Sequence, residues 1–157
     1  MNALRLCSLI TYVWFGSCVF VHHSHSQTKF TTEYHNGVTS AFRLDSTYYG
    51  VNSKYDWNLY VNTNEQTKYI KGLAEKCLSP AFNELEFKGK KYVILTLYIN
   101  DEGELLNVIY SARVQEWSFS EKFLNADSTF RKSFKLAFDQ KPNFDFIVIN
   151  QSLCIDC

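Results

Sequence analysis

Hydrophobic and polar residues alternate along the stretch 91–114, and this alternation predicts two β-strands joined by a short turn. A period of two over this length is typical of strands, and Asp101-Glu102-Gly103 is typical of the loop of a β-hairpin. A hairpin alone is not stable in water, so other elements must cover its apolar face. That face is made by Val93, Leu95, Leu97 and Ile99 on the first strand and by Leu106, Val108, Tyr110, Ala112 and Val114 on the second.

A first helix is expected to begin at Thr63, because Gln66 follows at the spacing of a capping box. Its apolar face would carry Tyr69, Ile70, Leu73, Ala74 and Cys77. Ser79-Pro80 is expected to end this helix, since proline removes a backbone donor. The helix would then lie directly before the central hairpin.

A second helix is expected after the hairpin, beginning at Ser118 with Glu121 at capping-box spacing. Pro142 is expected to end it, and residues 127–129 could break it into two pieces, with Asp127 or Ser128 capping the second. The aromatic and small residues of this region recur at steps of three and four: Phe119, Phe123, Ala126, Phe130, Phe134 and Phe138. Such a stripe predicts a helix face packed on the sheet.

The two ends of the chain add further strands. Asn36-Gly37 between the runs 29–35 and 38–44 is a strong hairpin signal, because both turn residues must take positive φ. Residues 57–61 could form a brief strand. The last predicted strand contains Phe144, Asp145, Phe146, Ile147, Val148 and Ile149. The order predicts an α+β fold: an antiparallel sheet of the central hairpin 91–114 and the C-terminal strand, packed by two helices, with an extra N-terminal β-hairpin.

The composition is that of one globular domain. The chain has 157 residues, of which 46% are hydrophobic and 17% aromatic. Sixteen basic residues balance sixteen acidic ones, so no net field would attract a nucleic acid. Nucleic-acid binding is therefore not expected.

The first 26 residues predict a cleaved export signal. Arg5 precedes an uncharged run, residues 6–21, and the small residues Ser24 and Ser26 place the cut between Ser26 and Gln27. The run falls short of the ~20 residues that span a membrane. Lipid attachment at Cys18 is a further alternative, disfavoured by the apolar residues 19–21. The protein is thus expected in the periplasm or outside the cell, with residues 27–157 as one domain and no membrane span after cleavage.

No metal or cofactor is expected in the mature domain. The histidine cluster of His22, His23 and His25 falls in the removed signal, and His35 has no obvious histidine partner. The turn 101–104 is too short for a calcium loop, and no nucleophile elbow, metalloprotease or phosphate-loop motif occurs. We therefore expect no catalytic residues of these kinds.

Residues 64–150 resemble the C-terminal domain of TonB-type proteins. The resemblance rests on the order helix, Pro80, YVILTLYINDEGELLNVIY, aromatic-spaced helix, Lys141-Pro142 and closing strand. It implies a periplasmic domain that captures an extended partner peptide by strand addition, with pairing at the terminal strand. The chain departs from the family's energy transducers, because it lacks an uncleaved membrane helix and a proline-rich span. Residues 27–62 form an extension outside the resemblance, and residues 151–157 are expected to be a tail.

Cysteines are the main alternative source of chemistry. Cys77, Cys154 and Cys157 remain after the predicted cleavage, and any two of them could form a disulfide. Cys154 and Cys157 have redox spacing, but reactive pairs gain a low thiol pKa from a following helix, which is not expected here. Two hypotheses result: a non-catalytic module that binds another envelope protein or peptide, and an exported thiol/disulfide protein acting through Cys154 and Cys157.

Overall fold

The computed structural model describes residues 29–44 and 56–155, and every structural statement below refers to these residues. The elements, in chain order, are β1 (Phe30–His35), β2 (Val38–Arg43), a 3-10 turn η1 (Trp57–Leu59), α1 (Thr63–Phe82), β3 (Tyr92–Asn100), β4 (Leu105–Ala112), α2 (Glu121–Ser133) and β5 (Phe146–Cys154). This confirms the predicted α+β class, with the extra N-terminal hairpin present as β1 and β2.

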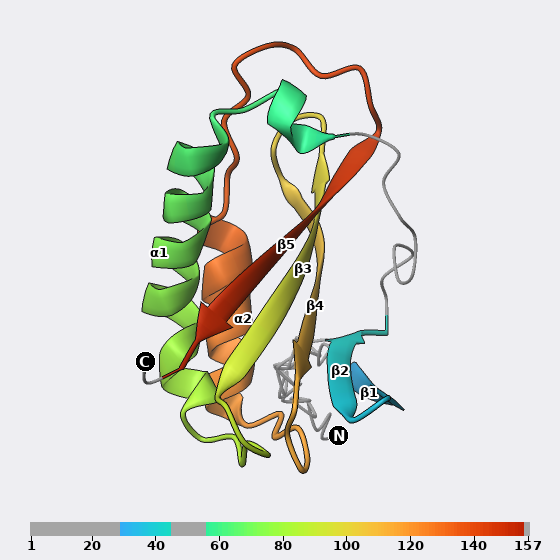
Figure 1. Ribbon diagram of the computed structural model, residues 1–157, viewed down its shortest axis with the longest axis vertical. Coiled ribbons are helices and arrows are strands. Elements are labelled where there is room, and N and C mark those ends of the chain that lie inside the picture. Colours follow the sequence, from blue (N-terminus) through green and yellow to red (C-terminus); the bar gives the residue numbers. More distant parts are fainter. Residues whose placement is uncertain (1–28, 45–55, 156–157) are drawn as a thin grey trace, which may run out of the picture.

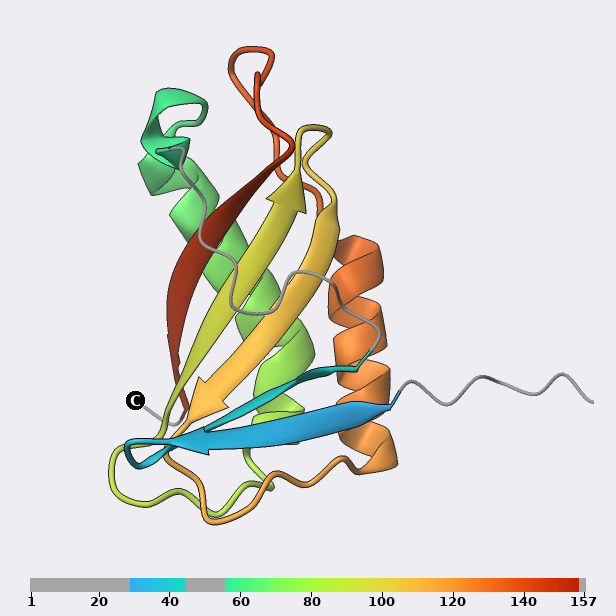
Figure 2. The same ribbon diagram turned by 90° about the vertical axis from the view of Figure 1, so that its right-hand side faces the viewer.

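All strands belong to one antiparallel sheet in the order β1-β2-β4-β3-β5. Both described helices lie on the same face of this sheet, and no helix of residues 29–44 or 56–155 lies on the other face (Figures 1 and 2). The pairing of β2 with β4 is limited to the last residues of β4, from Tyr110 to Ala112, so the β1–β2 hairpin runs across the end of the sheet (Figure 2). The N-terminal extension therefore continues the main sheet.

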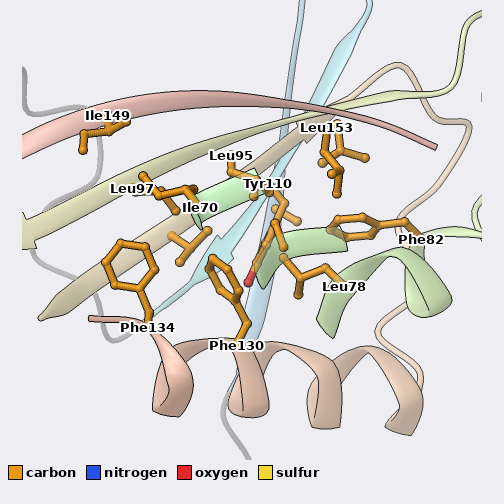
Figure 3. Packing of buried hydrophobic residues seen from close by; sticks show 14 of the residues in the cluster. Ile70, Leu78, Phe82, Leu95, Leu97, Tyr110, Phe130, Phe134, Ile149 and Leu153 are labelled. Carbon is orange, nitrogen blue, oxygen red and sulfur yellow. The ribbon is translucent and has the colours of Figure 1, made fainter. Parts of the chain in front are cut away.

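The core lies between the sheet and the helices, and it contains most of the face that the alternation predicts. Leu106 is the exception: a register shift between Tyr98 and Ile99 pairs Ile99 with Leu105, and Leu105 packs against the core in its place. Leu95 and Leu97 on β3 and Tyr110 on β4 are fully buried there. Figure 3 shows them packed against Ile70, Leu78 and Phe82 of α1 and against Phe130 of α2. The period of two is thus the signature of a sheet with one covered face.

Local sequence explains the first turn. Asn36 and Gly37 both take positive φ, at 50° and 83°, as the tight turn between β1 and β2 requires.

A side chain caps the start of each helix. Asn62 is the N-cap of α1, and its side chain accepts a hydrogen bond from the Glu65 N–H at 3.4 Å. Ser120 has the same role at α2, through Phe123.

The helix boundaries differ from those predicted. α1 continues through Pro80 to Phe82, because burial of Ala81 and Phe82 outweighs the one backbone bond that proline removes. α2 begins after Ser120, not near Ser118, and it passes unbroken through Asp127.

The second helix also ends earlier than Pro142. It stops at Ser133, and residues 134–145 are irregular. The backbone N–H of Leu136 donates to the Gly103 carbonyl at 2.8 Å, so this segment turns toward the central hairpin. Its aromatic residues still reach the core, since Phe134 is 4% exposed. The brief strand expected at 57–61 is the turn η1 at its start.

Candidate functional site at the edge of the sheet

β5 lies at one edge of the sheet and is longer than the predicted strand. It pairs with β3 along its whole length, from Tyr92 opposite Cys154 to Asn100 opposite Phe146. Phe144 and Asp145, which the prediction placed in the strand, precede it, and residues 151–154 belong to it instead of to a tail. The strand continues because Leu153 and Ile155 extend the buried face of Ile147 and Ile149, and β3 offers a partner to each residue.

The register of β5 decides which backbone groups face the edge. The Ile155 N–H donates to the Lys91 carbonyl at 2.8 Å, which places the odd-numbered residues in the hydrogen-bonded pairs with β3. The N–H groups of Val148, Asn150 and Ser152 therefore point away from β3. Within the described part of the chain, no hydrogen bond reaches these N–H groups. They form a row of open donors at the edge.

Side chains on both faces of β5 are held in place by their contacts. Ile147 and Ile149 are 0% and 3% exposed, so they anchor β5 to the core. On the other face, the Thr96 hydroxyl donates to the Asn150 side-chain oxygen at 2.8 Å. The Ser152 carbonyl accepts from the side chain of Gln151 at 2.9 Å. The open part of the edge is therefore centred on Val148 and Asn150.

The remaining predicted edge residues lie at the start of the strand. Phe144 is buried, with its ring against Tyr60 and Phe138 at centroid distances of 5.0 and 5.7 Å. Asp145 is exposed. Phe146 is half-buried, with its ring 6.3 Å from that of Tyr98. Phe144 and Asp145 precede β5 and do not extend its edge, whereas Phe146 is the first residue of the strand.

β1 forms the opposite edge. It has six residues against nine in β5, and it pairs only with β2. The exposed Glu33 and His35 stand on it, and Tyr34 is 68% exposed. A charged side chain such as that of Glu33 on a short edge strand is a common means of discouraging further pairing. β5 is thus the longer edge and the better anchored one.

The cysteines do not form the bridge from Cys77 that the sequence allowed. Cys77 is a free, half-buried thiol on α1. Cys154, at the end of β5, is disulfide-bonded. Cys157 lies outside the described residues, as do His22, His23 and His25 and the predicted signal. No group of three metal-ligating side chains occurs in the described ranges. None of the helices described there is long and apolar enough to cross a membrane.

A buried polar network was missed by the sequence reasoning, which took Asp127 as a helix break. Its carboxylate accepts from Arg131 Nε at 2.8 and 3.0 Å and from the Tyr110 hydroxyl at 2.6 Å. Burial raises the pKa of Tyr110 well above its usual value, and the negative charge of Asp127 raises it further. The available signal was the four-residue spacing of Asp127 and Arg131 together with a tyrosine on the apolar strand face. The network joins α2 to β4.

The comparisons with known proteins assign no family to this chain. No protein-family model and no curated protein matches the chain. Among solved structures, the chain is similar to the crystal structure of a DUF5043 family protein from Bacteroides uniformis, with 7% sequence identity and a TM-score of 0.48. The likeness covers 83% of this chain and 82% of that one.

Proposed function

We propose that this protein is an exported, non-catalytic binding module of the cell envelope, which captures an extended peptide of a partner protein by β-strand addition along β5. The observation that carries the proposal is the row of edge-facing donors at Val148, Asn150 and Ser152. An extended peptide satisfies such groups directly, with affinity from the backbone and selectivity from alternate side chains. The resemblance of residues 64–150 to TonB-type C-terminal domains supports the same mode.

Backbone hydrogen bonds at this edge would supply part of the free energy of reversible capture. Each backbone hydrogen bond contributes about 0.5–1.5 kcal/mol net, so a ladder of about five would contribute roughly 2.5–7.5 kcal/mol. Ordering a free peptide consumes part of this gain. The half-buried side chain of Val148 offers the incoming strand an apolar neighbour on the face away from the helices. We infer that side-chain contacts of the partner supply the rest.

Val148→Pro tests the proposal. Proline deletes the edge-facing N–H of residue 148 but no bond of the β3–β5 ladder, and edge strands accommodate its φ. We expect a folded protein that no longer captures its partner. Val148→Thr keeps β-branching and the N–H and should bind as the wild type does. Ile149→Pro is the matched control, because its N–H faces β3 and its loss should destabilise the fold itself.

The partner would first be obtained by cross-linking in the native envelope with the wild-type protein. Amide hydrogen exchange then locates the contact: exchange at Val148 and Asn150 should slow in the complex. If Val148→Pro is folded and captures the same partner as well as Val148→Thr, strand addition at β5 is wrong. If protection appears on β1 instead, the partner uses the opposite edge.

One pair of substitutions distinguishes the alternative thiol function from peptide binding. Replacing Cys154 and Cys157 together by serine should leave partner capture intact if the module acts through its backbone edge. Loss of a dithiol-exchange activity, measured with a disulfide-bonded reporter peptide, would favour the thiol hypothesis. The disulfide at Cys154 supports a structural role for this residue, since it lies opposite Tyr92 at the end of the ladder.

Export is part of the same proposal. The uncharged run 6–21 and the small residues before Gln27 support cleavage after Ser26. The intact mass of the protein recovered from its native compartment should correspond to residues 27–157. A mass that includes Met1, or a lipid on Cys18, would contradict export by this route.

A further inference from the structure

The sheet face opposite the two described helices has a concave pocket at the start of β3 and the end of β4. Its volume is about 550 Å³, within the range of pockets that hold small molecules. The lining residues come from the start of β2, the loop before β3 and both central strands: Val38, Lys88, Gly89, Lys90, Tyr92, Ile94, Ser111, Ala112 and Arg113. The pocket is separate from the edge of β5, because none of its described lining residues belongs to that strand.

The floor of this pocket is apolar and open to solvent. Tyr92 and Ile94 on β3 are 45% and 43% exposed, although large hydrophobic side chains are more often buried. They are the exposed large hydrophobic residues of the described central strands. An apolar body placed on them would remove this surface from water, at roughly 25 cal/mol per Å² buried.

The rim is cationic. Lys88, Lys90 and Arg113 are all exposed, and no acidic residue is found among the described residues that line the pocket. None of the ion pairs in the described part of the chain involves these three side chains. The backbones of Lys88 and Arg113 are adjacent, since the Lys88 N–H donates to the Arg113 carbonyl at 2.7 Å. Three basic side chains thus line one pocket with no acidic side chain among its described lining residues, which favours an anion at this rim.

Two other pockets of the described residues lack this combination. One, of about 370 Å³, is lined by Glu84, Glu86 and Glu116, and would repel an anion. The other, of about 350 Å³, has basic residues but contains the buried pair of Asp127 and Arg131. An apolar floor and an unopposed positive rim occur together only at the pocket of Tyr92 and Ile94, among the three.

We propose that this pocket binds a small amphipathic carboxylate, with its apolar chain or ring on Tyr92 and Ile94 and its carboxylate among Lys88, Lys90 and Arg113. The charge of the rim selects the anion, and the exposed floor selects an apolar body. This activity goes beyond peptide capture and does not depend on it. Val148→Pro should therefore leave it unchanged.

Titration with three ten-carbon probes tests the proposal: decanoate, 1-decanol and decyltrimethylammonium, each at concentrations where it is monomeric. Backbone NMR shifts report the site. Decanoate should bind saturably, with a Kd on the order of 1 mM or below, and shift the amides of Tyr92 and Ile94. The alcohol should bind several-fold more weakly and the cation should not bind. Equal affinity for decanol and decanoate would overturn the assignment of the rim, and no saturable binding of decanoate would overturn the site.

Substitutions test the cationic rim and the apolar floor of the pocket separately. Lys90→Glu should weaken decanoate binding by about threefold or more without affecting decanol. Ile94→Asp should weaken both. Lys76→Glu is the matched control, because it makes the same charge change at an exposed position on α1. If Lys76→Glu weakens decanoate binding as much as Lys90→Glu does, the attraction is a general charge effect and the proposal is wrong.

Discussion

Gly103 joins the central hairpin to the segment after α2, and its replacement by alanine should be among the most destabilising small changes in the chain. Its φ is +82°, in a region that residues with a Cβ seldom adopt. Its carbonyl accepts the Leu136 N–H at 2.8 Å. A Cβ built at this position would overlap the backbone carbonyl of Leu136, which cannot move aside as a flexible side chain could.

The expected magnitude follows from these contacts. The left-handed φ costs about 1–2 kcal/mol in an alanine. Forcing the Leu136 backbone away costs about 1–3 kcal/mol, as overpacking does. Alanine regains about 0.4–1 kcal/mol by restricting the unfolded chain. The net loss in the free energy of unfolding should be about 3 kcal/mol for Gly103→Ala, or a fall in Tm of about 6–12 °C for a chain of this size.

Gly89→Ala provides the matched control. Gly89 has a φ of +93°, yet nothing lies within 4 Å of a Cβ built there. Gly89→Ala should lower the free energy of unfolding by only about 1 kcal/mol: the cost of the left-handed φ, reduced by the gain from restricting the unfolded chain. Urea unfolding of the wild type and both variants, at equal m-values, gives the two losses. Equal losses for Gly103→Ala and Gly89→Ala would refute the contact with Leu136.

Two further predictions concern the core. Leu97→Asp should abolish cooperative folding, because residue 97 is fully buried and an unpaired carboxylate there costs several kcal/mol; a Tm near that of the wild type would mean that the inner face is misassigned. Above pH 10 the unfolded chain ionises its tyrosines while Tyr110 stays protonated, so stability should fall as pH rises, with up to about 1.4 kcal/mol per pH unit from this residue. Tyr110→Phe should make that fall shallower, measured by urea unfolding at several pH values above 9.

Much of the fold could be predicted because it depends on contacts close in the sequence. Asn36-Gly37 specifies its turn through two positive φ angles, which needs no knowledge of other elements. The alternation along β3 and β4 separates a covered face from an open one, and Leu95 and Leu97 lie on the covered face. The choice of β5 as an edge strand also agrees with the sheet order.

Boundaries depended on partners distant in the sequence. β5 extends to Cys154 because β3 pairs with each of its residues, although Asn150 and Ser152 by themselves indicate a turn. α1 passes Pro80 because Phe82 finds a place in the core, and α2 ends at Ser133 because Leu136 bonds to Gly103. These boundaries depend on contacts between residues far apart in the sequence, so a short segment of sequence cannot predict them.

The candidate sites divide in the same way. Composition and alternation alone determined that the chain has a sheet with one covered face, a hairpin turn at Gly103 and an apolar strand near its end. Only the tertiary structure decided that the Val148 N–H faces the open edge, that Asp127 is buried against Tyr110, and that Lys88 stands beside Arg113. The physical reason is that each of these features depends on how two elements lie relative to each other: which way a backbone group faces at an edge, whether a charge is buried, and whether like charges come together. Periodicity, in contrast, is a property of a single element.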